Sequence, residues 1–186
     1  RNVIDSMIHP LLEESNPVFQ RFAVELIYQY QLSGYRTNLT ELATHSNSPS
    51  SLRAASLNAL DRLDFPFSKQ LLHSLLQDND RTVRLRVMNL LIKHNPTSFL
   101  STFQNVLLHG SIPAQQDVLL VLSTIETSEV TSLLKDFLRQ LIAGDVSESL
   151  VLDILQSSTA RKREELQPLL RQYQNILPAD DTLASF

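Results

Sequence analysis

Three segments of equal length decide how this chain folds: Phe19–Ile27 (FQRFAVELI), Leu52–Leu60 (LRAASLNAL) and Val83–Leu91 (VRLRVMNLL). They begin 33 and then 31 residues apart, and each opens on an apolar residue and closes on an apolar pair. A weaker fourth copy, Ala114–Leu122, begins 31 residues further on. A period of this length accommodates one pair of helices, and such a pair buries its apolar face only when neighbouring pairs stack on it.

The rest of the chain has the same helical character. Apolar residues recur three and four positions apart, as in Leu57, Leu60 and Leu63, and there is no Asn-Gly or Asp-Gly hairpin signal. We predict about eleven helices, over residues 3–14, 17–33, 38–46, 49–63, 69–77, 81–94, 96–108, 113–124, 128–143, 147–157 and 160–176.

Capping residues mark where these helices begin and end. The dipeptides Asn16-Pro17, Ser48-Pro49 and Asn95-Pro96 each predict an N-cap followed by proline at the first helical position. Further predicted N-caps are Ser68, Asp80, Ser128 and Ser147. The glycines, which are the residues best suited to a left-handed C-terminal conformation, are Gly34, Gly110 and Gly144.

Together these patterns predict an all-α fold, an α-α superhelix of the HEAT-like or armadillo type with about five helix pairs. We expect a single domain over residues 1–177 and a C-terminal linker over 178–186 that leads to a following domain. Because the sequence begins at Arg1 and not at Met, we read it as a fragment of a longer protein.

Composition excludes several classes of function. The 186 residues are 42% hydrophobic and carry a net charge of −4, which suits a globular chain and argues against non-specific nucleic-acid binding. The absence of Cys excludes disulfides, thiolate metal sites, a Cys nucleophile and an attached c-type haem within these residues. No apolar run reaches the roughly 18 residues of a membrane span.

Nothing in the sequence predicts catalysis. The five histidines are dispersed without metal-ligand spacing, and the paired carboxylates are adjacent residues, which do not face one another on a helix. Three glycines are too few for a phosphate-binding loop. We therefore expect no catalytic residue, no cofactor-binding residue, no metal ligand and no cofactor in this fragment, which we do not expect to be an enzyme.

Basic side chains are the first candidates for an interaction surface. One cluster consists of Arg53, Arg62, Arg81, Arg84 and Arg86, and in one interpretation these residues line one face of the helix array and bind an acidic partner. In the other interpretation Arg53 and Arg84 form hydrogen bonds within or between repeats, for example to Asp61, Asp78 or Asp80. The run Arg161-Lys162-Arg163 either lies on a solvated face or docks to a neighbouring domain.

Phe65 and Phe67, on either side of Pro66, are the aromatic candidates. They either plug the gap between repeats or form an exposed anchor for another domain.

The second and third copies resemble HEAT repeats, in which an apolar residue followed by Arg opens the second helix. Leu52-Arg53 and Val83-Arg84 match that pattern, and Phe19-Gln20 departs from it. A narrower resemblance covers most of the chain. The segments SLNALDRLD, LLIKHNP, HGSIPAQQDVLLVLSTIET, LIAGD, LDILQSSTARK and LPADDTLASF are similar to one region of large exported bacterial proteins, the membrane-bound dehydrogenase or haem-binding proteins of planctomycete-type bacteria.

In those proteins a sugar-dehydrogenase-like propeller precedes the HEAT repeats, and a c-type haem domain follows. The resemblance implies a non-catalytic scaffold or spacer and protein-interaction segment, in a periplasmic or cell-envelope protein whose parent is an oxidoreductase. No family catalytic or haem-ligating residue maps onto this chain. A stand-alone protein- or peptide-binding repeat module is the alternative. The expected partners are neighbouring domains or another protein, with no nucleic acid and no membrane span.

Overall fold

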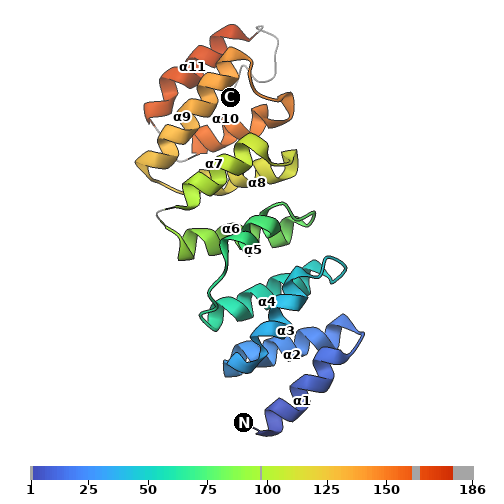
Figure 1. Ribbon diagram of the computed structural model, residues 1–186. Helices are drawn as coiled ribbons and strands as arrows, with labels where there is room; N and C mark the ends of the chain where they lie inside the picture. Colours follow the sequence, from blue (N-terminus) through green and yellow to red (C-terminus); the bar gives the residue numbers. More distant parts are fainter. Residues whose placement is uncertain (1, 97, 161–163, 178–186) are drawn as a thin grey trace. The chain divides into compact units, whose positions relative to one another are not determined.

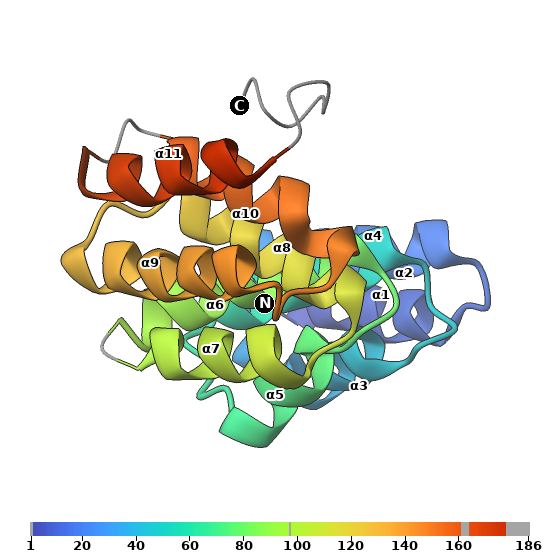
Figure 2. The ribbon, with the colours of Figure 1, turned by 90° about the horizontal axis from the view of Figure 1, so that it is seen from above.

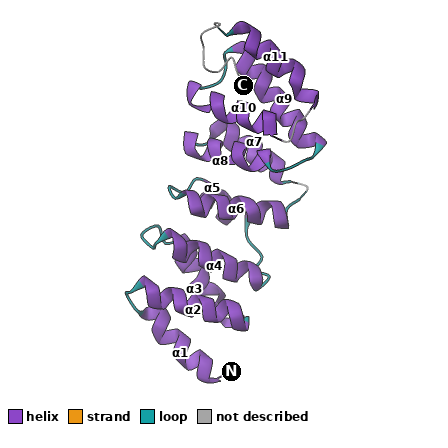
Figure 3. Ribbon diagram, turned by 180° about the vertical axis from the view of Figure 1, so that it is seen from behind, coloured by secondary structure: helices purple, strands orange, loops and turns teal. Residues whose placement is uncertain are grey.

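The structure is a computed structural model that describes residues 2–96, 98–160 and 164–177. These residues form eleven α-helices and three short 3-10 helices, with no strand among them (Figures 1 and 3). The predicted all-α class is confirmed. The sequence predicts one domain over 1–177, whereas the contacts divide the chain into two compact units, Arg1–Asn95 and Pro96–Phe186. The predicted linker over 178–186 lies outside the described residues.

The N-terminal unit consists of three helix pairs in chain order (Figure 1). Within each pair the two helices pack together, and the second helices of successive pairs also pack on one another, α2 on α4 and α4 on α6. The helices are α1 (Asn2–Glu13), α2 (Pro17–Tyr30), α3 (Arg36–Thr44), α4 (Ser50–Arg62), α5 (Lys69–Leu76) and α6 (Arg81–His94), with the 3-10 helix η1 (Ser33–Tyr35) before α3.

The C-terminal unit continues the same plan. Helices α7 and α8 form one pair and α9 and α10 the next, α10 packs on α8, and α9 lies between α7 and α11 (Figure 2). The bounds are α7 (Phe99–His109), α8 (Ile112–Ser123), α9 (Ser128–Ala143), α10 (Val151–Thr159) and α11 (Gln167–Ile176), with the 3-10 helices η2 (Glu148–Leu150) and η4 (Glu164–Leu166).

The apolar repeat positions form the core of each unit. Val24, Leu57 and Met88 occupy equivalent positions of the first three copies, and all three are buried, as are Ile27, Leu60 and Leu91, three residues later in each copy. Each second helix therefore turns one apolar stripe inward, which is the physical reason for the repeat in the sequence.

A polar repeat position links the two helices of a pair. The residue after the opening apolar residue of each copy is Gln20, Arg53, Arg84 or Gln115. In three copies its side chain donates to a carbonyl in or beside the last turn of the preceding helix, where helical carbonyls lack backbone partners. The bonds are Gln20 Nε2 to Leu12 O (3.2 Å), Arg53 Nε to Ala43 O (3.1 Å) and Gln115 Nε2 to Leu107 O (2.8 Å). Gln20, which departs from the Arg of the pattern, makes the same kind of bond.

Several predicted helix ends are confirmed. The side chains of Asn16, Ser68 and Asp80 each cap a helix by accepting from a backbone N–H, at 3.0, 3.1 and 2.8 Å. Gly144 ends α9 in the left-handed region with φ 80°.

Other predicted ends differ from the structure. Pro49 occupies the N-cap position that Ser48 was expected to fill, and Thr127 replaces Ser128. Asn95 is the C-cap of α6, because α7 begins only at Phe99. Gly34 falls inside η1, since α2 ends at Tyr30 and its C-cap, Gln31, adopts the left-handed conformation (φ 52°). Gly110 is the C-cap of α7, as predicted, but its φ of −77° is not left-handed.

Candidate functional site

Two of the predicted interaction residues lie inside the N-terminal unit. The side chains of Arg53 and Arg84 are buried, with only 3% and 4% of each residue exposed. Arg53 binds both carboxylate oxygens of Asp78, and its Nη1 lies 2.9 Å from Asp78 Oδ1. Arg84 Nη1 donates to the backbone carbonyls of Asp78 and Asn79, at 2.7 and 3.0 Å. These contacts are hydrogen bonds within and between repeats, which was one of the two interpretations of the sequence. They hold the loop between α5 and α6 against α4 and α6.

Burial alone raises the pKa of the Asp78 carboxyl. The hydrogen bonds from the Arg53 guanidinium and from the backbone N–H of Asp80 outweigh burial, so the pKa of Asp78 lies below its ordinary value. The carboxylate therefore stays charged beside Arg53, as a buried ion pair requires.

Asp61 on α4 is the centre of a second ionic cluster. Its carboxylate is bonded by three side chains of α6: Arg86 Nη2 at 2.9 Å, Lys93 Nζ at 2.9 Å and His94 Nε2 at 2.7 Å. Burial raises the pKa of Asp61, and these hydrogen bonds lower it further than burial raises it, so the net pKa is below its ordinary value. The cluster joins α4 to α6, the second helices of two successive repeats.

The ring of His94 also contacts the predicted aromatic pair. Phe67 lies 5.8 Å from His94 between ring centroids, and Phe65 meets Phe67 edge to face at 5.3 Å. Both phenylalanines are half-buried. The rings therefore fill the space at the end of α6, which favours the plug between repeats over the exposed anchor.

Around Asp61 the second helices enclose a concavity of about 410 Å³. Three basic side chains and one carboxylate line it, together with an exposed tyrosine and an asparagine: Tyr28, Asn58, Asp61, Arg62, Arg86 and Lys93. The Arg62 guanidinium carbon lies 5.6 Å from the centre of the Tyr28 ring, a cation–π distance. We call this set the basic concavity.

Donor groups remain for a ligand in the basic concavity. Arg62 and Lys93 are exposed, so a ligand can reach their charged groups. Arg86 Nε has no hydrogen-bond partner among the described residues, but this atom is itself buried. Because one carboxylate faces three cations, the surface has an excess of positive charge in a chain whose net charge is −4. Such a surface suits carboxylate groups of a partner.

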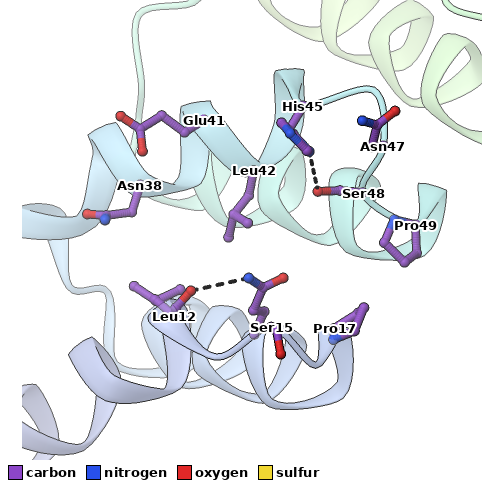
Figure 4. Close-up of a pocket in the computed structure, with 11 residues that line it drawn as sticks. Leu12, Ser15, Pro17, Asn38, Glu41, Leu42, His45, Asn47, Ser48 and Pro49 are labelled. Atoms are coloured by element: carbon purple, nitrogen blue, oxygen red, sulfur yellow. Dashed lines mark hydrogen bonds between the residues drawn. The ribbon is translucent and has the colours of Figure 1, made fainter.

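A second concavity of about 410 Å³ lies between the α1–α2 turn and the α3–α4 loop (Figure 4). His45 Nδ1 lies 3.2 Å from Ser48 Oγ there, a pairing that resembles part of a nucleophilic site. A carboxylate would be needed to orient the imidazole, but Figure 4 shows Glu41 pointing away from His45, and no hydrogen bond joins them among the described residues. His45 and Ser48 therefore lack the third group of a catalytic triad in this structure.

The remaining predicted residues are placed as follows. Arg86 lies in the basic concavity, and Arg161, Lys162 and Arg163 lie outside the described residues. Arg62, a member of the predicted basic cluster, also lies in the basic concavity. Tyr28, Asn58, Asp61 and Lys93 were not predicted as interaction residues. The repeat register held a signal for Lys93, because it follows Arg62 by 31 residues, the same offset as between the second and third copies.

Comparison with known proteins finds no relative: no protein-family model matches the chain, and neither a curated protein nor a solved structure matches it at a significant level. Across the part of the chain that the structure describes, no helix is both long and apolar enough to cross a membrane. Within those same residues no group of three or more His, Cys, Asp or Glu is arranged to hold a metal ion.

Proposed function

We propose that this chain is a non-catalytic solenoid of HEAT-like repeats that serves as a scaffold and protein-interaction segment. The observation that carries the proposal is the basic concavity, to which the second helices of three successive repeats each contribute side chains. Stacked repeats expose such surfaces over several helices at once, and partners of repeat proteins bind along them.

The chemistry of the basic concavity selects an acidic partner segment with an apolar or aromatic side chain. Arg62, Arg86 and Lys93 offer charged donors to carboxylates, and the exposed Tyr28 ring offers apolar contact area. Since Lys93 and Arg62 are exposed to solvent, their attraction is screened by salt, and binding depends on ionic strength.

A fluorescein-labelled peptide of glutamates with one phenylalanine tests this proposal by fluorescence anisotropy. Wild-type protein should bind it, and binding should weaken as salt rises from about 50 to about 500 mM, where the Debye length falls several-fold. The double variant Arg62→Glu, Lys93→Glu should bind at least tenfold more weakly. The control Lys69→Glu, Arg139→Glu makes the same charge change on exposed side chains outside the concavity and should bind like wild type. Equal loss in both variants would refute the site.

The resemblance to exported haem-containing dehydrogenase-like proteins supports a more specific role. In that setting the repeats hold a propeller and an electron-accepting haem domain at a set separation, in the periplasm or cell envelope. The alternative is a stand-alone module that binds a peptide or folded protein. The full open reading frame distinguishes the two: a Cys-x-x-Cys-His motif beyond Phe186 supports the spacer, and a stop codon near Phe186 supports the separate module.

A further inference from the structure

Two of the charged donors of the basic concavity are already paired within the chain. Arg86 Nη2 and Lys93 Nζ each lie 2.9 Å from the carboxylate of Asp61, which is on α4 between them and the rest of the concavity's lining. The same two cations are donors that an acidic partner would use. A carboxylate of the partner must therefore compete with Asp61 for Arg86 and Lys93.

The two cations differ in how far solvent reaches them. The side chain of Lys93 is 61% exposed and that of Arg86 is 24% exposed, whereas that of Asp61 is 13% exposed. An ion pair with an exposed lysine contributes little to stability, because water solvates the ammonium group and the long side chain loses rotamer freedom when it is held. Lys93 is thus the cation that can leave Asp61 at the lower cost.

Asp61 keeps a hydrogen-bond donor on each oxygen when Lys93 leaves. Arg86 Nη2 remains on Oδ2, and His94 Nε2 lies 2.7 Å from Oδ1, the oxygen that Lys93 contacts. An imidazole can donate from Nε2 in its neutral form, so this bond does not need a protonated ring. The ring of Phe67 packs beside that of His94, at 5.8 Å between centroids. The exchange therefore avoids the main penalty, an unpaired carboxylate in a partly buried place.

We propose that Lys93 is an exchangeable side chain of the basic concavity, which pairs with Asp61 in the free protein and with a carboxylate of the acidic partner in the complex. Arg86 and His94 keep Asp61 paired after the exchange. Asp61 is then an internal competitor that weakens binding. It is a positioning residue, because it acts through Lys93 and does not itself contact the partner. This proposal rests on the function proposed above for the same surface.

Binding of the fluorescein-labelled glutamate peptide, measured by fluorescence anisotropy at about 50 mM salt, tests the exchange. Asp61→Asn removes the charge that holds Lys93 and should lower the dissociation constant at least about threefold. Asp64→Asn removes the same charge from an exposed residue just after α4, outside the concavity, and should change the constant less than about twofold. Asparagine suits the left-handed backbone of Asp64, so this control keeps the fold.

A double-mutant cycle shows whether Asp61 acts through Lys93. Lys93→Met keeps the apolar part of the side chain but removes the ammonium group, and it should weaken binding at least about threefold. In that background Asp61→Asn has no lysine to release and should tighten binding less than about twofold. Equal tightening in both backgrounds would overturn the proposal, because Asp61 would then act on the peptide directly.

Stability measurements separate the exchange from damage to the fold. Asp61→Asn should lower the urea midpoint of unfolding while it tightens binding, because the Asp61 carboxylate also joins α4 to α6. Loss of folded protein would weaken binding, so it cannot imitate this result. A second variant, His94→Ala, removes the donor that replaces Lys93 on Asp61 and should weaken binding at least about twofold. His109→Ala, at an exposed histidine of α7, should not weaken it.

The outcomes distinguish this proposal from the one on which it rests. Absence of binding in wild type and in every variant would refute the acidic partner, and the exchange with it. Binding by wild type that Asp61→Asn leaves unchanged or weakens would overturn the exchange and leave the acidic partner in place. Equal effects of His94→Ala and His109→Ala would also overturn the exchange.

Discussion

Arg53 on α4 donates hydrogen bonds to both carboxylate oxygens of Asp78. Asp78 lies 25 residues further along the chain, in the loop that leads into α6. The pair is almost wholly removed from solvent, and Arg53 at the same time donates to the Ala43 carbonyl at the end of α3. One side chain thereby connects α4 with the end of α3 and with the loop between α5 and α6.

Replacement of Asp78 by Ala should therefore destabilise the N-terminal unit by about 3–5 kcal/mol, because it leaves a buried guanidinium without its counter-charge. Urea denaturation followed by circular dichroism measures the loss. Asp136→Ala is the matched control, since it breaks the exposed Arg139–Asp136 pair and should cost at most about 1 kcal/mol. Equal losses in the two variants would contradict the structural role assigned to Asp78.

Stability should fall in acid because of Asp61 and Asp78. Both have a pKa in the folded protein below that of an unfolded chain, which is about 3.9 for Asp. Their contribution is therefore fully present above about pH 5 and is lost as the pH falls through the lowered pKa values. Unfolding free energies from pH 7 to about pH 3 test this expectation. Asp61→Asn and Asp78→Asn should each reduce the slope in that acid range, and an unchanged slope in both would count against these assignments.

Leu90→Ala should cost about 2–5 kcal/mol, because Leu90 is fully buried on α6 and its removal leaves a cavity. Leu120→Ala, at an exposed leucine of α8, should cost far less. A loss below about 0.5 kcal/mol for Leu90→Ala would be incompatible with a buried leucine at this repeat position.

Two glycines should respond to alanine with opposite sign. At both Gly34 and Gly144 an added Cβ meets nothing within 4 Å, but only Gly144 has positive φ. Gly144→Ala should destabilise by about 1–2 kcal/mol through backbone strain. Gly34→Ala should be neutral or stabilise by up to about 1 kcal/mol, because it restricts the unfolded chain. Thermal unfolding of the two variants measures the difference, and a destabilised Gly34→Ala would show that η1 needs glycine for another reason.

Features that depend on a few neighbouring residues could be predicted from the sequence. The spans of α6 and α9 agree with the predicted ranges, and the caps at Asn16, Ser68 and Asp80 follow from their own side chains. The predictions at Asn95 and Gly34 were wrong because more than one residue nearby can end or begin a helix. Asn95 ends α6 and does not cap a helix that begins at Pro96. Gln31, three residues before Gly34, adopts the left-handed conformation that ends α2.

The basic concavity could be predicted only in part. Arg84 and Arg86 look alike in sequence, but two positions along a helix turn a side chain by about 200°, so one points into the unit and the other toward the concavity. Asp61, Lys93 and His94 meet across more than thirty residues of chain, a distance that no local pattern encodes.

Local sequence was enough to establish that the chain is helical, where most helices lie and which stripe of each second helix is apolar, because hydrophobic periodicity and capping act over one or two turns. Which arginines are buried partners of carboxylates, and which remain for a ligand, became clear only from the packed helices. That choice depends on how successive helix pairs are rotated against one another, and the rotation is set by packing between residues far apart in the chain.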